Sequence, residues 1–189
     1  MNDVRFTFFD TAVGRCGIAW RAQDIAAVLL PEKTDAAARA RLARRFPQAR
    51  EAEPPPEIRR VIDGIVALLA GERRDLSDVA LDCESLPAFH RRVYEVARTI
   101  RPGSTLSYGE IAARLGEPRA AREVGEALGR NPFPIVVPCH RVVAAGGKLG
   151  GFSARGGVAT KLRLLEIEGA LAPEAPMLFG ELPRAVRRA

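Results

Sequence analysis

The sequence predicts an α/β (α+β) protein: a small N-terminal antiparallel sheet with helices, followed by a mainly helical C-terminal domain that contains a helix-turn-helix. Short apolar runs separated by turn residues open the chain, and apolar residues at helical spacing dominate its second half. A length of 189 residues suits one compact domain or two small ones. We place the domains at residues 1–85 and 86–170, followed by a basic, proline-containing tail over residues 171–189.

The first third of the chain predicts three strands and then a helix. Three apolar-rich runs follow one another and predict an antiparallel meander: residues 4–9, 13–20 and 25–30. A polar turn is expected at Asp10 and Thr11, between the first two runs. Thr34 has a side chain suited to cap a helix from Asp35 to Phe46.

The segment at residues 48–56 contains three successive prolines and predicts an exposed loop or linker. Apolar residues then recur at helical spacing from Ile58 to Leu69, and Gly71 ends the pattern. A further strand is expected over residues 76–81.

The second half predicts short helices joined by tight turns, the first of them marked by an apolar stripe over residues 89–100. Ser107 followed by Glu110 has the spacing of a capping box, which predicts a helix that ends at Gly116. Another helix is expected over residues 120–128. Two short helices across such a turn are a helix-turn-helix candidate, although any helical hairpin with a short loop gives the same pattern.

Positive charge is concentrated in one part of the chain. Residues 1–85 carry 13 basic and 14 acidic side chains, residues 86–170 carry 13 and 7, and residues 171–189 carry 3 and 2. The net charge of +6 therefore equals the excess of the middle segment alone. Such a segment suits a polyanion such as nucleic acid, and a solvated arginine-rich surface is the alternative.

The sequence also carries signals about location. No apolar run approaches the ~20 residues of a membrane helix, and the N-terminus lacks the layout of a secretory signal, so we expect a cytoplasmic protein without a membrane partner. Cys16, Cys83 and Cys139 are odd in number and widely spaced, which favours reduced thiols over a disulfide framework. Cys16 and Cys83 have strand-like neighbours and are expected to be small core residues.

Cys139 and His140 are the candidates for chemistry. A cysteine must be a thiolate to act as a nucleophile, and an imidazole reached directly or through one water can take its proton. Pro138 favours a turn in which both side chains face one pocket, and a buried, inert cysteine beside a surface histidine is the alternative. No metal and no cofactor are expected, because zinc-ligand spacings and phosphate- or dinucleotide-binding glycine motifs do not occur in the sequence.

Residues 131–143 closely resemble the active-site stretch of the methylated-DNA–protein-cysteine methyltransferases, also called O6-alkylguanine-DNA alkyltransferases. They read Asn-Pro-Phe-Pro-Ile-Val-Val-Pro-Cys-His-Arg-Val-Val. The resemblance covers residues 86–170 and includes three further motifs: Ser-Tyr at 107–108, Ala-Ala-Arg at 120–122 and Leu-Leu-Glu-Ile-Glu-Gly at 164–169. It implies repair of double-stranded DNA containing alkylated guanine, by transfer of the alkyl group to the protein's own cysteine once and without a cofactor. Nothing in the sequence suggests more than a monomer, so we expect a monomer.

The resemblance also implies roles for single residues. Cys139 matches the alkyl acceptor, His140 the base that acts on it through a water, and Glu168 the carboxylate that orients the histidine. Tyr108 matches the group that donates a hydrogen bond or proton to the departing guanine. Asn131 matches a residue that braces the turn before the cysteine.

Other matches concern the DNA and the damaged base. Arg122 matches a finger that fills the space left by a flipped base, on a helix that enters the minor groove. The resemblance implies DNA contacts at Ser107, Ala121 and Arg130, and contacts with the guanine at Val142 and Ser153.

Two other interpretations of the sequence stay open. The first is a non-catalytic module that binds alkylated DNA, or a regulator, against which the presence of Cys139 argues. The second is a cysteine hydrolase that uses Cys139 and His140 and turns over repeatedly.

Overall fold

The computed structural model describes residues 3–171, and its contacts divide them into two compact units. One unit contains the chain up to Pro87 together with residues 131–137, and the other contains residues 88–130 and the chain from Pro138 onward. The expected tail, apart from Leu171, lies outside the described residues.

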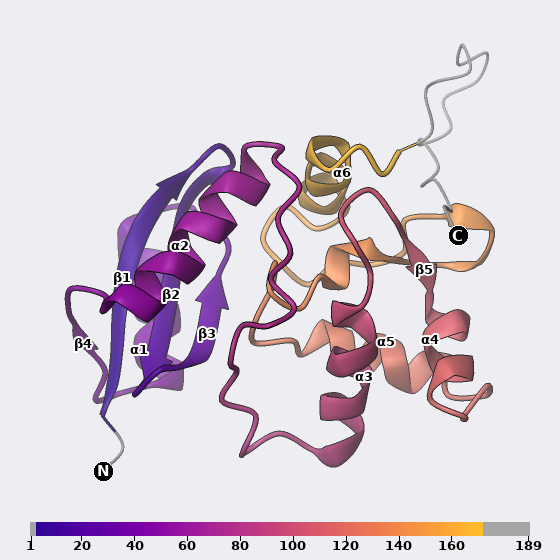
Figure 1. Cartoon of the computed structure of the whole chain (residues 1–189), viewed down its shortest axis with the longest axis horizontal. Coiled ribbons are helices and arrows are strands. Elements are labelled where there is room, and N and C mark those ends of the chain that lie inside the picture. Colours follow the sequence, from indigo (N-terminus) through magenta and orange to yellow (C-terminus); the bar gives the residue numbers. More distant parts are fainter. Residues whose placement is uncertain (1–2, 172–189) are drawn as a thin grey trace. The chain divides into compact units, whose positions relative to one another are not determined.

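The first unit is built on a four-stranded sheet in the order β3-β2-β1-β4 (Figure 1). Its first three strands are antiparallel neighbours and confirm the predicted meander: β1 (Val4–Thr11), β2 (Gly14–Arg21) and β3 (Asp24–Leu29). The turn after β1 falls at Ala12 and Val13, two residues later than expected. Asp10 and Thr11 are still paired with β2, and the Thr11 hydroxyl closes the turn by donating to the Gly14 carbonyl at 2.6 Å.

Two helices belong to this unit. α1 (Asp35–Arg45) is capped as predicted, because the Thr34 side chain accepts a hydrogen bond from the Ala37 backbone N–H at 3.2 Å. α2 (Pro56–Leu69) begins with a proline, which lacks the backbone N–H that the first turn of a helix leaves unpaired. The buried side chains of α2 form one stripe: Ile58, Ile62, Ile65, Leu68 and Leu69.

Two of the expected segments differ in the structure. The predicted loop over residues 48–56 contains a short strand, β4 (Arg50–Glu51), which pairs in parallel with β1. The strand expected over residues 76–81 is absent from this described segment, where only Leu81 forms a single bridge with Ile25. The reason is a turn at its start, where the Asp75 carboxylate accepts from the Ser77 backbone N–H at 2.9 Å.

The prediction that Cys16 and Cys83 are core residues is right for only one of them. Cys16 is fully buried in β2, and burial raises the pKa of its thiol to about 11. Cys83 is only half-buried, because it follows the single bridge at Leu81 and precedes a turn.

The second unit contains four helices among the described residues: α3 (Ala88–Arg98), α4 (Tyr108–Arg114), α5 (Ala121–Gly129) and α6 (Val158–Ile167). α4 and α5 pack on each other and on α3 and form the predicted helix-turn-helix (Figure 1). The capping box is present, since the Ser107 hydroxyl accepts from the Glu110 backbone N–H while the Glu110 carboxylate accepts from Ser107. The Tyr94 hydroxyl donates to the Ala127 carbonyl at 2.8 Å and ties α3 to α5.

Short elements complete the second unit. They are the paired strands β5 (Leu106–Ser107) and β6 (Val142–Val143) and the 3₁₀ helices η1 (Cys139–Arg141) and η2 (Ala145–Gly147). None of the described helices is long and apolar enough to cross a membrane. The structure confirms the predicted fold class, a small N-terminal sheet with helices followed by a mainly helical unit. The sheet is mixed and not wholly antiparallel, because β4 pairs in parallel with β1.

Candidate active site

A parallel pairing of β5 with β6 joins the two segments that carry Tyr108 and Cys139. Leu106 of β5 pairs with Val142 of β6. Tyr108 follows β5 directly as the first residue of α4, and Cys139 begins the 3₁₀ helix that leads into β6. The strand pairing therefore places the thiol of η1 near the start of the helix-turn-helix.

Cys139 lines a hollow of about 560 Å³, here called the Cys139 hollow. Four other residues that the sequence assigned to the site line it as well: Tyr108, Ala121, Arg122 and Ser153. Five residues that the sequence did not assign complete the lining: Gly125, Leu128, Gly129, Gly151 and Phe152. The volume suits a small planar group, and the lining combines apolar side chains with a thiol, a phenol and a guanidinium.

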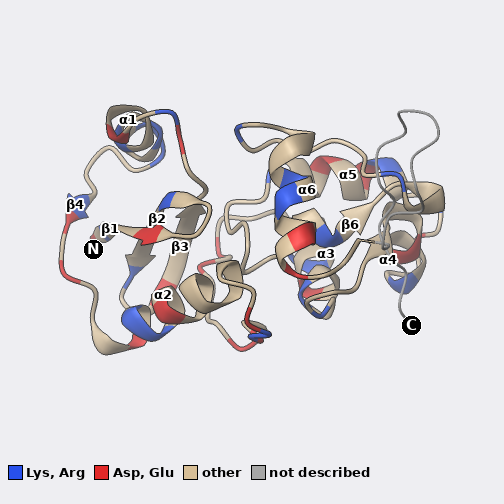
Figure 2. Ribbon diagram, turned by 90° about the horizontal axis from the view of Figure 1, so that it is seen from above, with Lys and Arg blue, Asp and Glu red and all other residues tan. Residues whose placement is uncertain are grey.

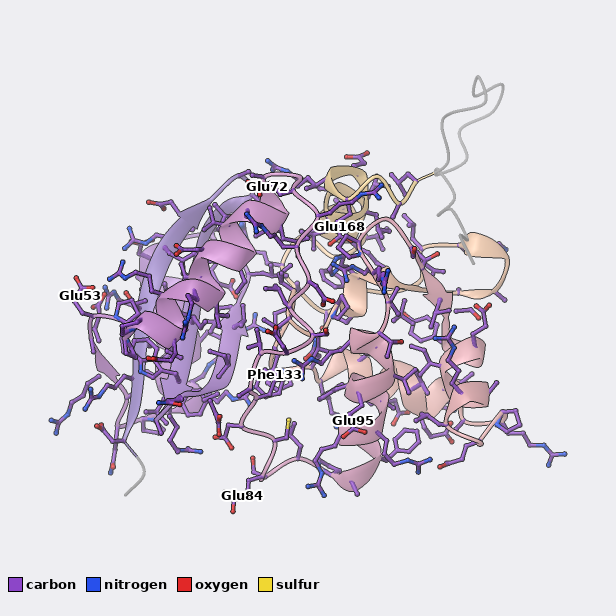
Figure 3. All side chains as sticks on the ribbon, in the orientation of Figure 1. Glu53, Glu72, Glu84, Glu95, Phe133 and Glu168 are labelled. Atoms are coloured by element: carbon purple, nitrogen blue, oxygen red, sulfur yellow. The ribbon has the colours of Figure 1, made fainter. Side chains whose placement is uncertain are left out.

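His140 lies behind this hollow and does not line it. Its imidazole is fully enclosed, and Nε2 lies 2.9 Å from Oε1 of Glu168. Glu168, labelled in Figure 3, is the residue directly after α6. The expectation that Cys139 and His140 face one pocket is therefore right for the thiol only. His140 Nδ1 is buried as well and has no hydrogen-bond partner among the described residues.

The protonation states of this pair follow from burial and from the neighbouring charges. Burial lowers the pKa of His140; the Glu168 carboxylate acts in the opposite direction, and the charges of Arg141 and Lys161 lower the pKa further. Burial raises the pKa of Glu168, but the charge of His140 in its protonated form, the hydrogen bonds from His140 and Arg141, and the charge of Arg141 outweigh this effect and lower it to about 2. The site therefore holds a carboxylate beside a neutral imidazole, which donates from Nε2 and keeps a lone pair on Nδ1.

Arg141 is a site residue to which the sequence gave no role. Its Nε donates to Glu168 Oε2 and its Nη2 to Oε1, both at 2.8 Å, and its Nη1 donates to the Ile100 carbonyl at 2.5 Å. The side chain is 6% exposed. Such a bidentate, enclosed pair fixes the carboxylate in one orientation.

Lys161 is the second residue that sequence reasoning missed. It is fully buried, its Nζ donates to the Val142 carbonyl at 2.6 Å, and Nζ lies 5.9 Å from the centroid of the Tyr108 ring. Burial lowers the pKa of Lys161 to about 8, although the charge of Cys139 acts in the opposite direction. The signal in the sequence is helical spacing: Lys161 falls on the same face as Leu164, Leu165 and Glu168, which are buried or half-buried.

Tyr108 is half-buried and closes one side of the Cys139 hollow. Burial raises the pKa of its phenol, and the charge of Cys139 adds to this effect, so the hydroxyl is kept as a donor. Gly150 lies against it with φ +67°, and a Cβ at this position would stand 3.3 Å from the Tyr108 hydroxyl oxygen. A glycine is required here both by the backbone conformation and by the close approach.

The residues expected to meet DNA lie mainly on α5. The Arg122 side chain is 90% exposed, and its Nε lies 3.5 Å from Oε1 of Glu126, one turn along the helix. Ala121 is the first residue of α5 and Arg130 its C-terminal cap. Basic residues also mark α3 and α6, drawn in blue in Figure 2, so the positive excess is spread over several helices of this unit.

Four other expected site residues lie outside the lining of the Cys139 hollow. Ser107 uses its hydroxyl in the capping box, and the carbonyl of Val142 accepts from Lys161. Glu168 lies behind His140, as described above. Asn131 belongs to the first unit, where Nδ2 donates to the Val137 carbonyl and Oδ1 accepts from the Phe133 N–H, both at 2.9 Å, and thereby ties the ends of segment 131–137 together.

The described residues contain no group of three or more His, Cys, Asp and Glu side chains that could hold a metal ion. What they do bring together is a thiol in a hollow, a buried histidine–carboxylate pair beside it, and a helix-turn-helix with an exposed arginine at the rim. This combination defines a DNA-binding protein that carries a nucleophilic cysteine.

Comparison with known proteins makes this class specific. Residues 88–170 match the family model for the DNA binding domain of 6-O-methylguanine DNA methyltransferase. The methylated-DNA–protein-cysteine methyltransferase of Methanothermobacter thermautotrophicus is 38% identical over 154 residues, which is 81% of this chain and 78% of that protein. A DNA base-flipping protein of Thermus thermophilus is 44% identical over 127 residues, or 67% of this chain and 82% of that protein.

Among solved structures, the crystal structure of Mycobacterium tuberculosis OGT in complex with DNA superimposes with a TM-score of 0.72 at 36% identity. The match covers 87% of this chain and 92% of that chain. The chain belongs to the methylated-DNA–protein-cysteine methyltransferase family, which repairs O6-methylguanine in DNA by transferring the methyl group to a cysteine.

Proposed function

We propose that Cys139 is the cysteine that accepts the alkyl group, from alkylated guanine in double-stranded DNA and once per molecule. The observation that carries this proposal is the place of Cys139, which lines a hollow next to Arg122 of the helix-turn-helix and is followed directly by the buried His140–Glu168 pair. The other two cysteines lack such surroundings, since Cys16 is enclosed in the sheet and Cys83 lies in the first unit.

The residues around the thiol support a displacement reaction. His140 Nδ1 takes the proton of Cys139, directly or through a water, and Glu168 stabilises the imidazolium that forms. The thiolate then attacks the alkyl carbon, the bond from that carbon to the guanine oxygen breaks, and its electron pair leaves with the guanine. The Tyr108 hydroxyl donates to a ring nitrogen of the guanine, so the leaving group does not build up full negative charge.

The thiol has access to the damaged base only if the base leaves the duplex stack. Arg122 is the residue we assign to the space that the base leaves, because its exposed side chain stands at the rim of the Cys139 hollow. We place further DNA contacts at Ser107, Ala121 and Arg130, at the start of α4 and at the two ends of α5. This arrangement suits entry of α5 into the minor groove, whose degenerate code matches a search for damage at any sequence.

In this proposal Val142 and Ser153 contact the flipped guanine. The Val142 carbonyl accepts from Lys161 and has a second lone pair for an exocyclic amine. Ser153 lines the Cys139 hollow and is exposed. Asn131 contributes indirectly, by bracing the segment that precedes Cys139.

We further propose that the protein works as a monomer, without a cofactor, in the cytoplasm. In support of a reducing compartment, none of the three cysteines, all of which are described, forms a disulfide.

The direct test is the intact mass of the protein after incubation with an oligonucleotide that carries one O6-methylguanine. We expect the gain of one methyl group, on the peptide that contains Cys139, and no gain in Cys139→Ser. Cys16→Ser is the matched control and should gain the methyl group like the parent. Unchanged mass with retained binding would favour a non-catalytic binder of alkylated DNA, and more than one turnover per molecule would favour a hydrolase.

A further inference from the structure

Arg141 is the most completely engaged polar side chain near the thiol. Its three nitrogens donate to both oxygens of Glu168 and to the Ile100 carbonyl, in a setting where the Arg141 and Glu168 side chains are 6% and 4% exposed. A buried ion pair of this kind contributes little net stability compared with apolar side chains of the same volume. Because stability alone does not explain this ion pair, and because it lies beside the candidate thiol, we look for its role in the chemistry.

The effect of Arg141 follows from the net charge of the three side chains in contact: His140, Glu168 and Arg141. Arg141 cancels the charge of Glu168, so the enclosed trio is neutral when the imidazole is neutral and carries one uncompensated positive charge when the imidazole is protonated. Without Arg141 the enclosed pair would carry one negative charge when the imidazole is neutral and no net charge when it is protonated. Among the described residues, His140 would then be the only charged partner in direct contact with the buried carboxylate. An isolated buried carboxylate strongly favours protonation of such a neighbour.

We propose that Arg141 is a positioning residue for alkyl transfer: by binding both oxygens of Glu168, it keeps His140 as a neutral imidazole with the proton on Nε2 and the lone pair of Nδ1 available to the thiol. In the reaction the proton moves from Cys139 Sγ to His140 Nδ1, and the sulfur electron pair forms the new bond to the alkyl carbon. This proposal rests on the proposed function, since it assigns His140 as the base for Cys139.

The protonation of His140 depends on several neighbouring groups that can carry charge. Lys161 approaches from α6 and Glu168 from the C-terminal cap of that helix, and Cys139 and Arg141 flank His140 in η1. Glu168 favours the imidazolium, whereas Arg141 and Lys161 both disfavour it. Arg141 differs from Lys161 because it holds the same carboxylate oxygen as His140, Oε1.

The experiment is a titration of the histidine ring nitrogens by NMR in a Cys139→Ser background, which removes the coupled thiol. The chain has 2 histidines, so His90 on α3 serves as the internal reference. In this background we expect the pKa of His140 to lie below its ordinary value of 6.5. The neutral ring should carry its proton on Nε2, which faces Glu168. Adding Arg141→Met should raise the proton affinity of His140 by at least about tenfold, a shift typical of one nearby opposite charge, and leave His90 unchanged.

Arg141→Gln keeps the proposal falsifiable if Arg141→Met does not fold, because its amide can donate to the Glu168 carboxylate without carrying a charge. The proton affinity of His140 should rise in Arg141→Gln as well, and by less in Arg141→Lys, which retains one charge but loses the fork. An unchanged titration of His140 in Arg141→Met, or in Arg141→Gln where Arg141→Met is unfolded, would overturn the proposal.

The titration of His140 and the test of the proposed function can fail independently of each other. Methyl transfer to Cys139 is measured by mass in the protein with its thiol intact, whereas the titration is done without the thiol and without DNA. A protein that fails to accept a methyl group but shows the expected titration would refute the proposed function alone.

Discussion

Lys161 of α6 and Glu168, the C-terminal cap of that helix, stand seven residues apart, and both side chains reach the segment that carries Cys139. Lys161 donates to the carbonyl of Val142, and Glu168 binds both His140 and Arg141. One helix and its C-terminal cap thus present a buried cation and a buried anion to one 3₁₀ turn and the strand after it. The orientation of α6 therefore controls the charge around the thiol, which leads to the first two predictions.

The thiol of Cys139 should lose acidity when Lys161 is replaced by Met. The Cys139 thiolate attracts the Lys161 ammonium and partly offsets the lowering of the Lys161 pKa by burial. The same attraction stabilises the thiolate, so removal of the ammonium disfavours the charged sulfur. We expect the midpoint of the pH profile for iodoacetamide alkylation of Cys139 to rise by about one unit. Cys16 is the control within the same molecule, since its pKa of about 11 should keep it unreactive at neutral pH. An unchanged midpoint would contradict the role assigned to this cation.

Glu168 should make the fold sensitive to acid. The pKa of its carboxyl is lowered from 4.5 to about 2, so its contribution to stability is present above pH 4.5 and is lost as the pH falls toward 2. This contribution is on the order of 3 kcal/mol. Urea unfolding at several pH values should show a steep loss of stability in that window, and Glu168→Gln should remove most of the slope. Glu51→Gln is the matched control, since its exposed pair with Arg39 should contribute little.

Gly150→Ala should slow methyl transfer as well as destabilise the fold. The added Cβ would stand 3.3 Å from the Tyr108 ring and hydroxyl oxygen. The alanine would also have to adopt the φ of +67° that Gly150 has. Gly146→Ala isolates the backbone effect, because Gly146 has φ +73° and its Cβ would meet nothing within 4 Å. We expect both variants to lose about 1 kcal/mol of stability, and only Gly150→Ala to react more slowly with DNA. Equal rates in the two variants would argue against Tyr108 as the donor.

Arg122→Ala should impair repair in duplex DNA far more than reaction with free O6-methylguanine. A free base needs no extrusion, so the contribution of an inserted side chain disappears with that substrate. Single-turnover rates with both substrates give the comparison. If both rates fell by the same factor, Arg122 would act on the Cys139 hollow itself and not on the vacated stack.

Glu126→Gln should tighten binding to DNA. The Glu126 carboxylate stands 3.5 Å from the Arg122 guanidinium on α5 and partly cancels its charge. An exposed pair of this kind is worth at most about 1 kcal/mol, so the expected gain in affinity is about twofold to fivefold. Glu95→Gln on α3 changes the net charge by the same amount and should have a smaller effect. Weaker binding in Glu126→Gln would show that the carboxylate orients Arg122 for DNA.

The sequence by itself determined the elements whose signals are local. Thr34 and Ser107 predicted the starts of α1 and α4, because a cap depends on a residue and the next three along the chain. The strands of the meander followed from three short apolar-rich runs separated by turn residues. The position of the candidate thiol came from the Pro-Cys-His-Arg-Val run, which is also local.

Tertiary structure alone decided the partners that are distant in the chain. Arg141 and Glu168 are 27 residues apart, and Lys161 and Val142 are 19 apart, so helical or strand periodicity does not link them. Segment 131–137 lies between the two parts of the second unit in sequence, yet the Val28 N–H donates to the Pro132 carbonyl at 2.9 Å and ties it to the first. Burial, charge cancellation and the protonation of His140 follow from these long-range contacts, because each depends on which groups packing brings within a few ångströms of one another.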